Sequence, residues 1–171
     1  MMRKIARAMV GASAAGLMAM AGCGAGPSGS AAGTTAGAAA VGATQTLAGD
    51  STSLVVTVHD VVKGTQNARI GGRAVPVTNQ LVSVDAEVCL HGFNGTVRAS
   101  DRWQLVDAAS GRYGPEPRPA EGLKPAYPYA SENVLDGECV RGWISFLTEK
   151  DPVVTVRYAT ETGHTLRWDI N

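Results

Sequence analysis

The most regular hydrophobic pattern in the chain is an alternation of apolar and polar residues from Leu81 to His91. The apolar positions are Val82, Val84, Ala86, Val88 and Leu90, and the positions between them are Ser83, Asp85, Glu87 and Cys89. Successive side chains of a β-strand point to opposite faces, so a period of two is typical of a strand with one buried face. Residues 81–91 are therefore predicted to form a half-buried strand.

A second alternation follows the Asp136-Gly137 turn signal and runs from Cys139 to Leu147. Its apolar side consists of Val140, Gly142, Ile144 and Phe146, and its other side of Cys139, Arg141, Trp143 and Ser145. The pattern predicts another half-buried strand. In both segments the cysteine lies on the side opposite the aliphatic residues.

Further short strands are predicted by β-branched or aromatic runs that end at turn residues. These runs are 54–62, 103–107, 153–158 and 165–170. Residues 65–79 contain Gly71-Gly72 and Pro76, and they are predicted to form a loop or a short edge piece. No segment has a convincing helical period. About six short strands in about 120 residues predict an all-β fold, an antiparallel β-sandwich.

The N-terminal segment has the layout of an export signal. Arg3, Lys4 and Arg7 precede an apolar run at 8–21, which is short for a membrane span. The run ends in Met20-Ala-Gly-Cys23, which resembles the bacterial lipobox, with methionine where leucine is usual. By that resemblance the chain is cut before Cys23, and lipid on Cys23 anchors it to the membrane. The alternative is an ordinary secretory signal that is cut after a small residue.

Three segments are predicted: a lipoprotein signal peptide at 1–22, the lipidated Cys23 with a flexible linker at 23–50, and one domain at 51–171. The linker is almost entirely Gly, Ala, Ser and Thr. Such a composition buries too little apolar surface to offset the entropy of ordering, and it predicts a tether with a reach of roughly 30 Å. The 121 residues after it suffice for one domain with its own core.

The odd number of cysteines is explained if Cys23 carries the lipid. Cys89 and Cys139 then remain as a pair in an oxidising compartment, where disulfides persist. A Cys89–Cys139 disulfide is therefore predicted. The alternative is two free, buried cysteines.

Charge and composition exclude several classes of function. Losing three of the 15 basic residues with the signal leaves 12 against 15 acidic residues, a net charge of about −3. No basic run for nucleic acid remains. All five methionines lie in the signal, so the mature chain has no thioether ligand. Neither nucleic acid nor a cofactor is expected.

The candidate chemistry is weak. His59, His91 and His164 share no metal-ligand spacing, and the pattern favours surface histidines. The single close pair for a blue-copper site is Cys89-Leu-His91, and its cysteine is better used in the disulfide. There is no Gly-x-Ser-x-Gly motif. No catalytic or metal residue is predicted.

Residues 114–133 form the most informative exposed feature. They hold five of the eight prolines together with Tyr127 and Tyr129. Proline lowers the entropy cost of ordering a loop, and tyrosine supplies contact area with a polar tip. One interpretation is a partner-binding loop that uses Tyr127 and Tyr129. The other is a crossover between sheets, with proline guarding a strand edge.

The order of these features resembles a known family. A strand ends in Leu105-Val-Asp107, a turn carries Gly111-Arg-Tyr113, a long loop leads to Leu135-Asp-Gly137, and a strand ends in Phe146 before two closing strands. The order is similar to that of the immunoglobulin-like extracellular lipoprotein domain family of Gram-positive bacteria, which itself resembles the mycobacterial immunoprotective extracellular protein. The resemblance covers most of 55–170. It implies an immunoglobulin-like β-sandwich and no known activity.

One departure from antibody domains is predicted. Their disulfide joins the two sheets through the core. Here Cys89 and Cys139 lie opposite the aliphatic faces of their strands, so the bridge is predicted to join neighbouring strands on the outward face of one sheet.

These features favour a lipid-anchored, extracytoplasmic, non-enzymatic protein. It is expected to bind a protein or an envelope component through loops or a sheet face. The alternatives are an envelope enzyme with an unrecognised site and a small-ligand carrier.

Overall fold

The computed structural model describes most of the chain from residue 37 onward. The described residues are 37–64, 68–93, 97–98, 102–128, 133–149 and 152–170. They all belong to one compact unit, Gly33–Asn171. The predicted signal peptide and Cys23 lie outside the described residues.

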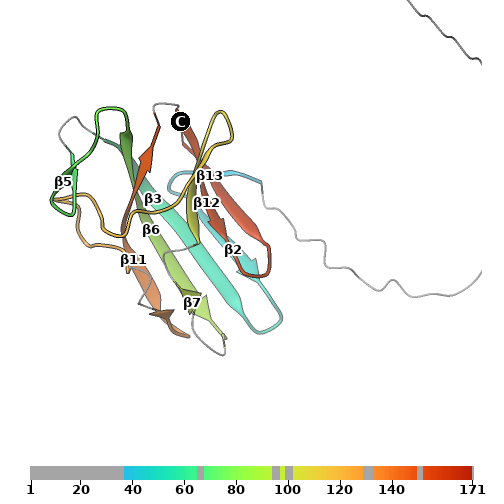
Figure 1. The fold of residues 1–171 in the computed structure, drawn as a ribbon. Coiled ribbons are helices and arrows are strands. Elements are labelled where there is room, and N and C mark those ends of the chain that lie inside the picture. The colour runs from blue at the N-terminus through green and yellow to red at the C-terminus, as the bar shows by residue number, and fades with distance from the viewer. Residues whose placement is uncertain are drawn as a thin grey trace, which may run out of the picture. The chain divides into compact units, whose positions relative to one another are not determined.

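Two sheets form the sandwich (Figure 1). The five-stranded sheet has the order β1 (Ala39–Ala40), β13 (Thr165–Asp169), β12 (Val153–Ala159), β8 (Trp103–Asp107) and β9 (Arg112–Tyr113). The four-stranded sheet has the order β11 (Cys139–Thr148), β6 (Gln80–His91), β3 (Ser53–Lys63) and β2 (Thr44–Ala48). Within these two sheets every pairing is antiparallel except that of β1 with β13.

The remaining strands form two short two-stranded sheets. One pairs β4 (Arg69–Ile70) with β5 (Arg73–Ala74), and the other pairs β7 (Val97–Arg98) with β10 (Asn133–Val134). The predicted all-β sandwich is confirmed. The described part of the chain contains no helix, and so none that is long and apolar enough to cross a membrane.

The two regular alternations form the centre of the four-stranded sheet. β6 and β11 pair without interruption from Cys89 opposite Cys139 to Gln80 opposite Thr148. All five apolar positions of the β6 alternation are buried, which confirms the predicted inward face. Because the period is two, a slip of one residue would turn this face toward solvent, so the hydrophobic pattern fixes the register.

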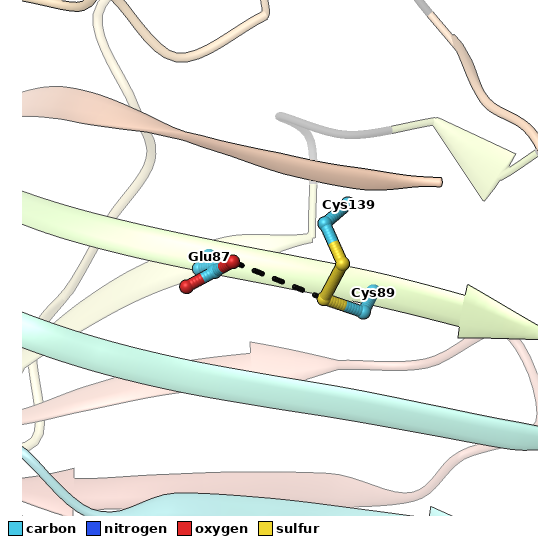
Figure 2. A group of neighbouring side chains, drawn as sticks. All are labelled: Glu87, Cys89 and Cys139. Carbon is cyan, nitrogen blue, oxygen red and sulfur yellow. Dashed lines mark hydrogen bonds between the residues drawn. A yellow bond between two sulfur atoms is a disulfide. The ribbon is translucent and has the colours of Figure 1, made fainter. Parts of the chain in front are cut away.

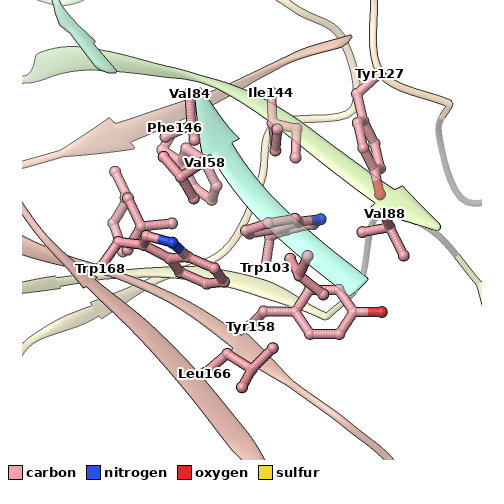
Figure 3. Packing of buried hydrophobic residues seen from close by; sticks show 14 of the residues in the cluster. Val58, Val84, Val88, Trp103, Tyr127, Ile144, Phe146, Tyr158, Leu166 and Trp168 are labelled. Carbon is pink, nitrogen blue, oxygen red and sulfur yellow. The ribbon is translucent and has the colours of Figure 1, made fainter. Parts of the chain in front are cut away.

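Aromatic rings fill the space between the sheets (Figure 3). Trp103 of β8 is fully buried, and its ring centroid lies 4.9 Å from that of Tyr158 and 6.1 Å from that of Trp168. Valines of β3 and β6 pack against these rings from the other sheet. The core therefore joins the two sheets by packing, whereas the core of an antibody domain also contains a disulfide.

A β-bulge changes which side chains of β3 face inward. The register with β6 shifts between Val58 and Asp60, which leaves His59 as the extra residue. A bulge of one residue reverses the alternation beyond it. As a result Val61 packs against the core. His59 keeps the outward direction that it has in the regular alternation and contacts Glu87 on the outer face.

The structure corrects the predicted linker boundary. Residues 39–48, assigned above to the flexible tether, form β1 and β2, with β1 in one sheet and β2 in the other. Val41 and Leu47 pack against the core, and the Trp168 indole donates a hydrogen bond to the Ala43 carbonyl at 2.7 Å. The stretch has too few large apolar residues to form structure alone, and the edges of an existing sandwich supply its partners.

Candidate functional site

The predicted Cys89–Cys139 disulfide is confirmed (Figure 2). The two residues are direct partners across β6 and β11, and their Cα atoms lie 4.0 Å apart. The Leu90 amide donates to the Glu138 carbonyl at 3.0 Å. That bond flanks a non-hydrogen-bonded pair, the kind of position where side chains approach most closely. The bridge joins neighbouring strands on the outer face, as predicted.

Glu87 lies beside the bridge and completes a group of metal-ligating residue types. Its Oε1 atom is 3.9 Å from the Cys89 sulfur (Figure 2). Glu87, Cys89 and Cys139 are the members of the one such group found among the described residues. Cysteine binds zinc as a thiolate, and both sulfur atoms are already bonded to each other. The Glu87 carboxylate instead meets His59 Nε2 at 2.7 Å.

The proline-rich segment lies along the free edge of β11. The Glu116 amide donates to the Ser145 carbonyl at 2.8 Å, and the Tyr127 amide donates to the Trp143 carbonyl at 3.1 Å. In return the Trp143 amide donates to the Pro125 carbonyl at 2.9 Å. These bonds satisfy the edge groups that would otherwise pair with another chain. The arrangement matches the interpretation of a crossover that guards an edge.

Tyr127 is not available as a contact residue. Its side chain is 1% exposed, and its ring stands edge-on to Trp103 at a centroid distance of 6.2 Å. Burial raises the pKa of the Tyr127 hydroxyl well above its usual value. The assignment of Tyr127 to a partner-binding surface is therefore wrong, because the apolar ring fills the core. Tyr129 lies outside the described residues.

Gly142 is the position that admits Tyr127 into the core. A Cβ atom at Gly142 would lie 2.4 Å from the Tyr127 nitrogen and 2.5 Å from the Ala126 carbonyl carbon. Replacing Gly142 by alanine is expected to lower the free energy of unfolding by about 1–3 kcal/mol, because the backbone of this segment must move away. Urea denaturation with the disulfide intact measures the loss.

Gly114 provides the matched control, since a Cβ atom there would meet nothing within 4 Å. Gly114→Ala is expected to change stability by less than about 0.5 kcal/mol. Equal stabilities of the two variants would contradict the close packing at Gly142.

Two motifs of the family resemblance form a single turn. The Asp107 carboxylate accepts hydrogen bonds from the Gly111 amide and the Tyr113 hydroxyl, each at 2.7 Å. The Tyr113 hydrogen bond is the main cause that lowers the pKa of Asp107. A Cβ atom at Gly111 would lie 2.5 Å from Asp107 Oδ2, so a larger residue there would displace the Asp107 carboxylate. The motif therefore closes the β8–β9 turn.

The outer face of the four-stranded sheet carries paired charges. Arg141 donates from Nε and Nη2 to the Asp85 carboxylate, at 3.2 and 2.7 Å. This bond raises the pKa of Arg141. The Arg141–Asp85 ion pair and the His59–Glu87 contact each join neighbouring strands, and such cross-strand pairs stabilise a sheet.

The outer face of the five-stranded sheet carries unpaired arginines. Val156 and Tyr158 of β12 face the core, so Arg157 between them faces outward. Arg157 lies directly opposite Arg167 of β13. Arg112 of β9 lies on the same side of the sheet. We call Arg112, Arg157 and Arg167 the arginine face.

The electrostatics of the arginine face differ from those of the other sheet. In the part of the chain that the structure describes, no carboxylate lies within 4.0 Å of a nitrogen of these three side chains. Arg157 donates to Gln104 Oε1 at 3.4 Å and to Thr165 Oγ1 at 3.2 Å, and its Nε is buried without a partner. Burial, together with the positive charges of Arg112 and Arg167, lowers the pKa of Arg157.

One cavity opens at an end of the sandwich. Its volume is about 410 Å³. The turn after β2, the residue before β8 and the β12–β13 turn contribute to its wall. Apolar side chains dominate its interior, and Arg102 and His164 are among its polar residues. We call this the end cavity.

Comparison with known proteins identifies a solved structure with the same fold. No family model matches the chain, and no curated protein matches it. The crystal structure of MPT63, a secreted protein from Mycobacterium tuberculosis, matches 82% of this chain and 100% of that chain, at 21% identity and a TM-score of 0.56. The two chains share a fold. An uncharacterized β-sandwich protein from Clostridium difficile matches 79% of this chain and 95% of its own, at 6% identity and a TM-score of 0.47.

The likeness to MPT63 confirms the predicted resemblance at the level of the β-sandwich fold. Neither the arginine face nor the end cavity was predicted from the sequence. The arginine face had a usable signal, because a hairpin centred on Thr162 places Arg157 opposite Arg167. The end cavity had none, since its wall comes from segments far apart in the sequence.

Proposed function

We propose that this protein is a lipid-anchored, non-enzymatic binding protein on the outer side of the cell membrane, and that its arginine face binds a phosphate-bearing component of the envelope. The observation that carries the proposal is the direct cross-strand pair of Arg157 and Arg167, with no carboxylate partner among the described residues.

The pair argues for a ligand because it is unfavourable by itself. Like charges directly opposite each other destabilise a sheet. Three other described arginines have acidic partners: Arg69 pairs with Glu121, Arg102 with Glu161 and Arg141 with Asp85. A bound anion removes the repulsion at the arginine face. Guanidinium groups match phosphate oxygens in a bidentate geometry and are weakly hydrated, so phosphate is the anion that the face suits best.

The proposed location rests on three supports. The N-terminal pattern that ends in Cys23 resembles a lipoprotein signal. The Cys89–Cys139 disulfide suits an oxidising compartment. The fold is shared with a protein that is described as secreted. Mass spectrometry of the processed N-terminus is expected to find a diacylglycerol on Cys23, and an unmodified cysteine would contradict the anchor.

Binding through a sheet face replaces the loop considered above, because Tyr127 is buried. A sheet face also offers a broad, nearly flat array of side chains, which suits an extended polymer or a headgroup layer. Among the described residues the one metal-ligating group is occupied by the disulfide. The Asp107 carboxylate is held in the β8–β9 turn by Gly111 and Tyr113, and the Asp85 carboxylate is held by Arg141. These features support a binding protein over an enzyme.

The test removes two positive charges from the arginine face. The full chain in phosphatidylcholine nanodiscs is titrated with soluble poly(glycerol phosphate), and separately floated with phosphatidylglycerol vesicles, so that a polymer and a lipid headgroup are distinguished. Arg157→Gln with Arg167→Gln is expected to weaken binding in one arm by about tenfold or more, from the loss of two charge-assisted contacts. Binding is also expected to weaken as salt is raised.

Arg73 supplies a matched control, since it is an exposed arginine on β5 without an ion pair in the described structure. Arg73→Gln is expected to leave binding within about twofold. The double variant is expected to be at least as stable to urea as the unchanged chain, because a like-charge pair is lost. Unchanged binding by the double variant, or an equal loss in Arg73→Gln, would refute the proposal.

A further inference from the structure

The end cavity has the size and composition of a small-molecule site. Its volume of about 410 Å³ lies within the range of about 300–1,000 Å³ that is usual for such sites. Leu54 and Leu90 contribute to its wall from neighbouring strands, and Phe93 and Tyr158 add aromatic rings. Tyr158 also contacts Trp103 in the core (Figure 3), so the cavity wall continues into the packed interior. An apolar group is the natural occupant of such a wall.

Arg102 gives the cavity a fixed positive charge. Its side chain is only 12% exposed, and it forms an ion pair with Glu161 of the β12–β13 turn. The Nε of Arg102 is buried and has no hydrogen-bond acceptor, and Nδ1 of His164, also in the wall, is buried without a partner. The wall therefore contains polar groups whose hydrogen-bonding capacity is not used.

Glu161 is an exchangeable partner for Arg102. Its side chain is 82% exposed, so it can turn into solvent and be fully hydrated there. Arg102 is nearly buried and needs a carboxylate partner, and a ligand carboxylate can take the place of Glu161. Arg102 and Glu161 are the two charged residues among the described lining residues, and His164 and Tyr158 are the other titratable ones. Once Glu161 turns away, the cavity presents a cation beside an apolar interior.

We infer that the end cavity binds a small amphipathic carboxylate, whose apolar part lies against Leu54, Leu90 and Phe93 and whose carboxylate replaces Glu161 on Arg102. This inference goes beyond the proposed function. It uses none of the three residues of the arginine face, so either proposal can fail without the other.

The test is a titration of the full chain with decanoate at neutral pH. The chain is held in phosphatidylcholine nanodiscs, and empty nanodiscs correct for partitioning of the probe into lipid. Calorimetry measures the affinity, and tryptophan fluorescence reports occupancy, because the ring of Trp103, one of three tryptophans, contacts Tyr158 of the wall. Saturable binding is expected. The neutral-head analogue 1-decanol is expected to bind more weakly, since it cannot form the ion pair with Arg102.

Two substitutions are expected to change the affinity for decanoate in opposite directions, which makes the test specific for the contact with Arg102. Arg102→Gln is expected to weaken decanoate binding by about tenfold or more and to leave decanol unchanged. Glu161→Gln is expected to strengthen decanoate binding by about two- to fivefold, because the competing carboxylate is gone. Glu161 is exposed, so this variant tests the inference even if Arg102→Gln folds poorly. Absence of saturable binding, equal binding of decanol, or weaker binding by Glu161→Gln would overturn the inference.

Discussion

Replacing Trp103 by alanine is expected to lower the free energy of unfolding by about 3–5 kcal/mol. Trp103 is fully buried, and rings from a loop and from two other strands surround it. Tyr127, Tyr158 and Trp168 would all face the void that the substitution leaves, and rings packed at such distances cannot collapse into it without leaving their rotamers. The loss is close to half the total stability of a typical domain. Urea denaturation followed by near-ultraviolet circular dichroism measures it.

Trp143 is the matched control. It is half-buried on the outer side of β11. Trp143→Ala is expected to cost clearly less than Trp103→Ala, because solvent already reaches part of the indole and no closed cavity is left. Similar losses for the two variants would show that the aromatic cluster is not the centre of the core.

Removing the disulfide by replacing Cys89 and Cys139 with alanine is expected to lower the free energy of unfolding by about 4 kcal/mol. The bridge spans 50 residues of sequence, and the chain-entropy relation gives about that value for a loop of this length. The native sheet should persist, because β6 pairs with β11 along its whole length and with β3 on its other side. The effect therefore acts mainly on the unfolded chain.

A rise in the denaturant m-value is the accompanying signature, because an uncrosslinked chain exposes more surface when it unfolds. The unchanged chain under reducing conditions serves as a second comparison, with no residue altered. A stability loss below about 1 kcal/mol would mean that the bridge hardly restricts the unfolded ensemble.

The strands were predictable where the pattern of burial is local. The alternation at 81–91 carries five buried residues at a period of two, and both its extent and its inward face are observed. The same parity argument placed both cysteines on the outer face. The bulge at His59 was not predictable, because a run of β-branched residues does not show which of its side chains face the core.

Features that depend on distant segments were not predictable. Tyr127 follows several prolines and looks exposed in the sequence, yet Gly142 leaves the space through which its ring enters the core. Residues 39–48 look too poor in apolar side chains to fold, and they gain their partners from the edges of the two sheets. In both cases the stabilising contacts lie across the fold, where composition and local propensity give no signal.

The two candidate sites also differ in whether the local sequence could predict them. The arginine face follows from one hairpin, since Gly163 has a φ of 86° and the Thr160 amide bonds the His164 carbonyl at 2.9 Å, which sets the register of Arg157 and Arg167. The end cavity needs Arg102 and Glu161 to meet across a separation of 59 residues. That kind of contact is visible only after folding.

The division of the first two strands between the two sheets has a mechanical consequence. Any pull on the chain ahead of residue 37 reaches the sandwich first through β1, which is held to β13 by only two residue pairs, and next through β2, an outermost strand. Both can peel away while the buried layer that begins at Leu54 stays closed. Releasing the ten residues 39–48 would lengthen the chain ahead of the sandwich by about 35 Å. The domain can therefore yield under tension in small steps before it unfolds.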